Sequence, residues 1–174
     1  MKDIILNVVL GIVTGLISGY IVTIYYRKKD MEKEFIFYCE RLLRYASFLS
    51  NTFMPLKLMY MDTNEIIKTL TDMEFPRRYT WLKTPRTLKE NSHLVNNLEN
   101  DCSLFLSNLL EYSNALMWSN VKDTTLECRE QHRKICDEKH KFLGKKWTDL
   151  SKDITQLLKI INGDKVSQKH SSKL

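Results

Sequence analysis

The chain has 174 residues, of which 43% are hydrophobic and 28% charged, and its net charge is +6. This balance is enough to bury the core of one ordinary domain, and it excludes a wholly disordered chain. Beyond residue 19 the only glycines are Gly144 and Gly163. Phosphate-binding loops of the Walker and dinucleotide types need several glycines close together, so the composition excludes both types.

The first expected element is a single transmembrane helix over residues 4–26. This run carries no charged residue, and at about 1.5 Å per residue it reaches about 34 Å, enough to cross a hydrocarbon core of about 30 Å. Tyrosines gather at its C-terminal end, as in the aromatic belts of membrane proteins. A cleavable signal peptide would instead place its basic flank before the apolar run, whereas here the basic flank follows it.

The basic cluster Arg27-Lys28-Lys29 directly follows the apolar run. The positive-inside rule keeps such a cluster on the cytosolic side, so we expect the rest of the chain to be cytosolic. The overall positive charge fits a domain beside an anionic inner leaflet, and nucleic acid is not required to explain it.

Three glycines, Gly11, Gly15 and Gly19, recur every four residues within the expected span. This spacing places them on one helix face, where another membrane helix can approach closely. The pattern favours a homo-oligomer, or pairing with the membrane helix of a partner. A membrane-disrupting effector that oligomerises through the same glycines is an alternative.

A cytosolic helical bundle is expected over residues 27–161. No glycine or proline occurs between Tyr20 and Met54, so the spanning helix is predicted to continue into the bundle until Pro55 ends it. Asp62 and Glu65 have the spacing of a capping box and predict a short helix that stops before Pro76. One face of the continuing helix has the spacing of a buried surface: Phe35, Cys39, Leu42, Ala46, Leu49 and Phe53.

Two further long helices are expected over residues 87–120 and 124–161, with Asn162-Gly163 as the stop of the second. Joined by a short connection, they must pack antiparallel. The fold class is therefore all-α, an elongated antiparallel bundle of three long helices and one short one. Residues 162–174 are expected to be a disordered basic tail. They end in Ser172-Lys173-Leu174, identical to the peroxisomal import tripeptide, which conflicts with a spanning helix recognised earlier in synthesis.

The loop from Pro76 to Arg86 mixes basic and aromatic residues and contains no acid. Such a mixture suits contact with anionic headgroups or with phosphate groups, although loops that merely cap a bundle have similar compositions. Membrane lipid is therefore an expected partner. The candidate contact residues are Arg27, Lys28, Lys29, Arg77, Arg78 and Lys83.

Four potential metal ligands, Cys128, His132, Cys136 and His140, are spaced one helical turn apart. Neighbouring pairs share a helix face and have the chemistry to chelate an ion. The whole row spans about 18 Å at helical rise, so one ion cannot take all four. We therefore expect no metal and no cofactor, and the row is kept as a minor alternative.

The spacing Arg86-x6-His93 resembles the Arg-x4-6-His motif of HEPN-superfamily RNases, and Arg133-x6-His140 fits it as well. The resemblance covers these spacings alone. It implies a helical-bundle RNase in which an arginine and a histidine from paired protomers handle the scissile phosphate and the leaving hydroxyl. A membrane-tethered RNase using Arg86 and His93 is thus an alternative function.

The leading hypothesis is a non-enzymatic, single-pass membrane protein whose bundle acts as an interaction or regulatory module with a protein partner. No serine–histidine–aspartate arrangement, HExxH motif or recognisable carboxylate pair can be read from the sequence. An excess of aromatic and methionine residues near the end of the first helix is the candidate partner surface, with core packing as its alternative: Phe48, Phe53, Met54, Met59, Tyr60 and Met61.

Overall fold

The structure is a computed structural model that describes the backbone of residues 2–122 and 124–171, and the side chains of residues 11–163 apart from 87 and 123. Every regular element in this part of the chain is a helix, as the sequence predicts for the fold class. The elements are α1 (Lys2–Thr52), α2 (Pro55–Leu58), α3 (Thr63–Thr71), α4 (Arg86–Lys89), α5 (Ser92–Asn120) and α6 (Leu126–Ser171).

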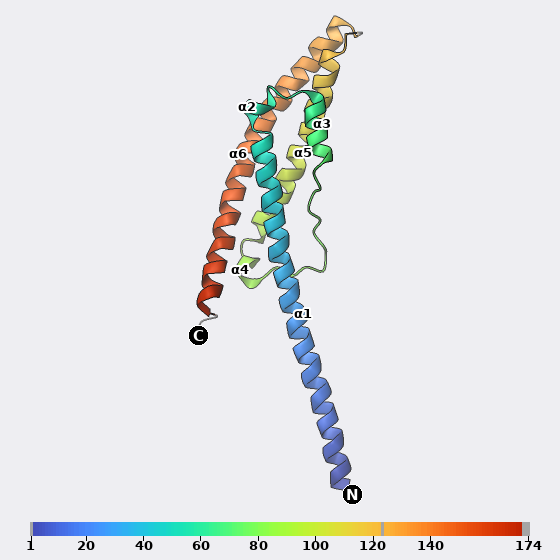
Figure 1. Ribbon diagram of the computed structural model, residues 1–174, viewed down its shortest axis with the longest axis vertical. Helices are drawn as coiled ribbons and strands as arrows, with labels where there is room; N and C mark the ends of the chain where they lie inside the picture. Colours follow the sequence, from blue (N-terminus) through green and yellow to red (C-terminus); the bar gives the residue numbers. More distant parts are fainter. Residues whose placement is uncertain (1, 123, 172–174) are drawn as a thin grey trace.

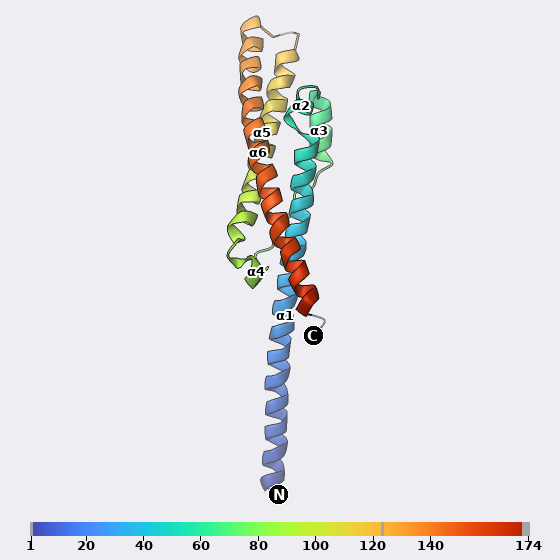
Figure 2. The ribbon, with the colours of Figure 1, turned by 90° about the vertical axis from the view of Figure 1, so that its left-hand side faces the viewer.

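The molecule is elongated, because the long helices lie side by side with their axes roughly along one direction (Figure 1). The N-terminal half of α1 projects alone from one end of the bundle, and the α5–α6 hairpin extends beyond α2 and α3 at the other end (Figures 1 and 2). We call the end from which α1 projects the base of the bundle. The loop between α3 and α4, α4 itself and the C-terminal end of α6 all lie near the base.

Helix α1 is unbroken over 51 residues, as the absence of glycine and proline after residue 19 predicts. Its second half forms one wall of the core, and the predicted buried face is confirmed. All six residues of that face have no exposed surface. Its first half differs completely, since every residue from 11 to 30 is exposed.

Helices α5 and α6 form the predicted antiparallel pair and share the most extensive packing in the bundle. Leu98, Phe105 and Leu109 of α5 are fully buried, as are Leu150 and Leu157 of α6. Burying such side chains stabilises the fold by about 1.5–3 kcal/mol each.

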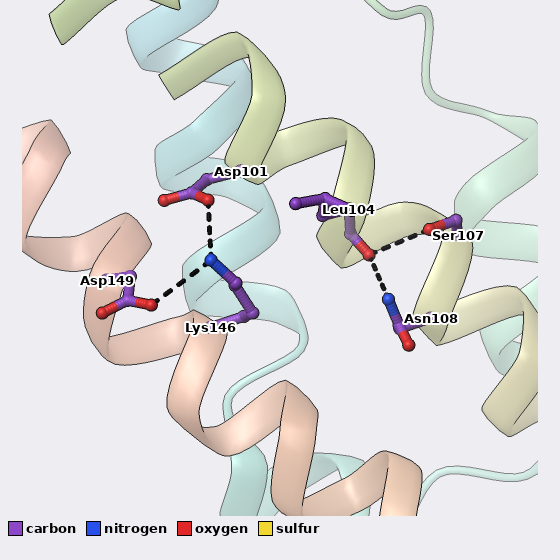
Figure 3. Close-up of polar contacts among 6 residues, drawn as sticks. All are labelled: Asp101, Leu104, Ser107, Asn108, Lys146 and Asp149. Atoms are coloured by element: carbon purple, nitrogen blue, oxygen red, sulfur yellow. Dashed lines mark hydrogen bonds and ion pairs between the residues drawn. The ribbon is translucent and has the colours of Figure 1, made fainter. Parts of the chain in front are cut away.

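A charged contact crosses the same interface. Lys146 of α6 donates a hydrogen bond to Asp101 of α5 at 2.9 Å and lies 3.4 Å from Asp149 (Figure 3). Nearby on α5, the amide of Asn108 donates to the carbonyl of Leu104, and its oxygen accepts a hydrogen bond from Lys139.

One short helix, α3, was predicted from the sequence, whereas α2 was not. Pro55 stands at the first position of α2, where its missing N–H costs nothing. The carboxylate of Asp62 accepts a hydrogen bond from the N–H of Glu65 at 2.8 Å, which confirms the predicted start of α3. Helix α2 packs against α6 beside Gly144, where a Cβ atom would lie 3.9 Å from Pro55 Cγ.

Two predicted boundaries are wrong. The helix expected over residues 87–120 is divided into α4 and α5, because Asn91 leaves helical geometry at φ −105° and ψ 14°. Helix α6 passes the predicted stop at Asn162-Gly163 and continues to Ser171. No glycine among the described residues has the positive φ that a glycine stop requires, so that stop does not form.

Within the described part of the chain, no helix is sufficiently long and apolar to cross a membrane. The side chains of residues 4–10, the first part of the expected span, lie outside that part. The side chains of residues 164–171 and the whole of the terminal tripeptide lie outside it as well.

Candidate functional site at the base of the bundle

The base of the bundle brings together most of the predicted basic contact residues. The α3–α4 loop descends along α1 and reaches the level at which α1 leaves the bundle (Figure 1). Arg27, Lys28 and Lys29 are exposed on α1, and Arg77 and Lys83 are exposed on the loop. The basic cluster on α1 and the basic loop therefore belong to one region of the molecule.

Arg78 differs from the other predicted contact residues, because its guanidinium turns toward the bundle. Its Nη1 donates a hydrogen bond to Oδ1 of Asn96 at 2.7 Å and lies 3.5 Å from Oε2 of Glu99. The guanidinium carbon also lies 5.3 Å from the centre of the Phe35 ring. Arg78 thus fastens the loop to both α1 and α5.

A buried tyrosine completes this contact from α1. The hydroxyl of Tyr38 donates to Oε1 of Glu99, so the two oxygens of that carboxylate serve α1 and the loop. Burial, followed by the hydrogen bond to Glu99, raises the pKa of Tyr38. The phenol therefore stays neutral and remains a donor over the whole physiological pH range.

Next to the fastening residue, two aromatic side chains face outward. The rings of Tyr79 and Trp81 stack with centroids 5.6 Å apart and planes inclined by 20°. Both side chains are about half exposed. An exposed, stacked aromatic pair beside a projecting apolar helix has the amphipathic character found at membrane–water boundaries.

Trp81 lines a groove of about 870 Å³ along α1. The groove begins at Val22, inside the last part of the apolar run, and continues for about two helical turns beyond Tyr26. Its walls are Val22, Thr23, Tyr26, Arg27, Asp30, Met31, Glu34 and Trp81. The loop therefore reaches back to the last residues of the expected membrane span.

Tyr79 lines two smaller cavities, and the larger of them shares Glu34 with the groove. They have volumes of about 180 and 440 Å³, and Arg41, Arg77 and Tyr79 line both of them. Arg41 lies 5.5 Å from the centre of the Phe37 ring. Among the described residues neither arginine has an ion-pair partner.

Some groove residues were missing from the sequence prediction. Asp30 and Glu34 are acidic and stand near a basic cluster, so composition alone gave no reason to select them. Their spacing of four residues does put them on one helix face with Tyr26, which was a usable signal. Arg41 gave no signal, because only the fold brings it to Arg77.

The Arg86 and His93 pair lies at the base as well. Arg86 is the first residue of α4, His93 is in the first turn of α5, and both side chains are exposed. In the part of the chain that the structure describes, no hydrogen bond or ring contact joins Arg86 to His93.

The cysteine–histidine row on α6 makes contacts with neighbouring elements. The His132 ring stacks on Trp118, the Cys136 thiol lies 4.0 Å from the Tyr112 carbonyl, and His140 hydrogen-bonds to the carbonyl of Pro55. Among the described residues, no group of three or more histidine, cysteine or acidic side chains is placed to hold a metal ion.

The predicted partner surface separates into buried and exposed members. Phe53 is fully buried in the core, and Met54 and Met61 are partly buried. Phe48, Met59 and Tyr60 are exposed, with Tyr60 at 87%. The exposed members flank the corner where α1 turns into α2.

Comparison with known protein families, curated proteins and solved structures finds no match to this chain.

Proposed function

We propose that this protein is a single-pass membrane protein whose helical bundle is held against the cytosolic surface as an interaction module. The observation that carries the proposal is the contrast within α1. One continuous helix has a second half that forms the core and a first half that packs into no core. Apolar side chains along that first half are broadly exposed, among them Ile12, Leu16, Ile17 and Ile21, with Leu16 at 70%.

Exposed apolar surface on this scale needs a cover, because soluble proteins rarely expose contiguous apolar patches of more than a few hundred square ångströms. A bilayer supplies that cover for an isolated helix, which satisfies its own backbone hydrogen bonds. Two hydroxyls in the segment are also satisfied internally. Ser18 donates to the carbonyl of Thr14 at 2.7 Å, and Thr23 donates to the carbonyl of Gly19 at 2.8 Å.

The charge distribution supports the proposed orientation of the chain in the membrane. The basic cluster Arg27-Lys28-Lys29 lies between the apolar half of α1 and the bundle, so retaining it on the cytosolic side retains the bundle there. The remaining basic residues at the base then face the anionic inner leaflet.

Membrane extraction with a topology reporter tests the anchor. The chain should stay in the membrane pellet at alkaline pH, and a C-terminal fluorescent fusion should fluoresce in the cytosol. A variant lacking residues 4–26 should be released. Recovery of the full chain in the alkaline supernatant would contradict the proposal.

Self-association through the glycine face is the second part of the proposal. A Cβ atom placed on Gly11, Gly15 or Gly19 would have no other atom within 4 Å outside its own helix, so no residue of the described part fills that face. Small residues at such spacing let two helix backbones pack closely. In membranes, Gly15→Leu should therefore reduce cross-linked dimers strongly.

The control for this change is Val13→Leu, which adds bulk to a different part of the same helix and should leave cross-linking unchanged. Equal dimer yields for wild type and Gly15→Leu would remove the glycine face from the proposal.

A protein partner is proposed to dock at the corner formed by Phe48, Met59 and Tyr60. Exposed aromatic and methionine side chains are typical of binding surfaces. Tyr60→Ser with Met59→Ser should lose a co-purified partner that Lys68→Ser, an exposed change on α3, retains. Loss of the partner in both variants, or in neither, would argue against this corner.

A further inference from the structure

We propose that the groove between Trp81 and α1 binds one phospholipid with a primary ammonium headgroup, of the phosphatidylethanolamine type. This inference rests on the proposed membrane anchor, since the groove meets lipid only if residues 4–26 span the bilayer. It goes beyond that proposal by naming the lipid class and the residues that select it.

The order of side chains along the groove matches the order of groups in such a lipid. Val22, Thr23 and Tyr26 form the end nearest the apolar run and suit the acyl chains. Arg27 follows and supplies a guanidinium for the phosphate. Asp30 comes about 4.5 Å further along the helix axis, and carboxylates there suit an ammonium group, which ethanolamine carries two carbons beyond the phosphate.

The net charge of the groove selects against a purely anionic headgroup. One arginine faces two acidic residues, Asp30 and Glu34, and these three are the only charged residues among its lining. Asp30 has an ion-pair partner in Lys33 at 3.9 Å, but both side chains are largely exposed. Such a pair contributes little, so a ligand ammonium can compete for the carboxylate.

A primary ammonium fits the groove better than a quaternary one. Carboxylate oxygens accept N–H hydrogen bonds, which ethanolamine donates and choline does not.

Height above the bilayer distinguishes this groove from the cavities around Tyr79. A headgroup layer is about 5–8 Å thick on each side. If Tyr26 stands at the edge of the hydrocarbon, Asp30 lies about 6 Å beyond it and Arg41 about 22 Å beyond it. Arg27 and Asp30 of the groove are therefore at the height of the headgroups. Glu34 stands about one helical turn further out, and Arg41, which lines the cavities beside Tyr79, is well above that layer.

The experiment uses the full chain in phosphatidylcholine nanodiscs with a minor fraction of brominated lipid, which quenches nearby tryptophan. The signal of Trp81 is the quenching in wild type minus the quenching in Trp81→Phe, which retains Trp118 and Trp147. Half-maximal quenching is expected at about fivefold less brominated phosphatidylethanolamine than brominated phosphatidylglycerol or phosphatidylcholine.

Asp30→Asn with Glu34→Gln should abolish this preference, whereas Glu32→Gln, the same kind of charge change outside the groove lining, should keep it. Equal quenching by all three lipids, or a preference for phosphatidylglycerol, overturns the inference. Nanodiscs that hold the chain without any Trp81-dependent quenching overturn it too and leave the anchor standing. A chain that does not float with nanodiscs overturns both proposals.

Discussion

Arg77 and Arg78 are adjacent and chemically identical, yet the fold gives them different roles. Arg77 is exposed and lines the cavities beside Tyr79. Arg78 joins Asn96 and Glu99 of α5 and stacks against Phe35 of α1. The second arginine therefore positions the loop that carries the first.

Arg78→Met should lower the free energy of unfolding of the full chain in detergent by about 1–3 kcal/mol, because a charged hydrogen bond is lost and Glu99 keeps only its Tyr38 donor. The measurement is chemical denaturation followed by circular dichroism. Arg77→Met is the matched control and should change stability by less than about 0.5 kcal/mol. Equal effects of the two changes would contradict the assigned roles.

The contribution of Lys146 to stability can be tested by its dependence on pH. The hydrogen bond from its ammonium to Asp101 is the largest cause that raises the pKa of Lys146. A lysine with a raised folded-state pKa stabilises the fold fully below its ordinary value of 10.5, and this stabilisation is lost as pH rises through the folded value. Lys146→Met should therefore cost about 2 kcal/mol near pH 7.

The difference in unfolding free energy between wild type and Lys146→Met should narrow above pH 10.5, the ordinary value, where the wild-type lysine also becomes neutral. Wild type and variant have the same tyrosines and cysteines, which titrate in the same range. Their contributions to the unfolding free energy therefore cancel in the difference. A difference that stays constant from neutral to strongly alkaline pH would mean that the loss comes from packing and not from charge.

At the scale of elements, the sequence pattern predicted α1, the antiparallel α5–α6 pair and the start of α3, because these depend on local spacing. It failed at residues 90–91, where a helix divides, and at Gly163, which remains helical. A glycine ends a helix only if the chain takes a left-handed turn there, and the residue type alone does not decide that.

Only part of the candidate site could be predicted, because a sequence pattern reveals local spacing and not contacts between distant residues. The basic loop could be identified from composition, but its fastening could not, because Arg78 lies 21 residues from Glu99 and Tyr38 lies 61 residues from it. The groove also depends on contact between residue 81 and a helix about 50–60 residues earlier. Such pairings come from the fold and leave no local pattern.

The position of Gly144 inside α6 leads to a prediction about stability. The residue is inside the helix, and an added Cβ meets only Pro55 Cγ, at an ordinary contact distance of 3.9 Å. Gly144→Ala should therefore stabilise the chain by about 0.5–1 kcal/mol through helix propensity. Thermal unfolding would show a higher midpoint, and a lower midpoint would mean that α2 packs more tightly on α6 than described.

At the scale of the whole molecule, α1 extends from the bundle core into the exposed projection beyond the base. The helix has no break between the glycine face and the core residue Leu49. Assembly of the membrane segments would therefore fix the spacing and rotation of the bundles attached to them. The base would face the lipid and the α5–α6 hairpin would extend away from it.

The central claim is that the bilayer covers the first half of α1 and ends near Tyr26. Single cysteines introduced along residues 12–34 and labelled with a water-soluble maleimide test it most directly. The background removes Cys128 and Cys136 by changes to serine. Cys39 and Cys102 can stay, because both are fully buried and burial raises the pKa of each thiol to about 12.

In intact membranes, cysteines from Ile12 to Tyr25 should resist labelling, and cysteines from Lys28 onward should label from the cytosolic side. Detergent should expose the protected positions. Uniform labelling of residues 12–34 in intact membranes would contradict the account.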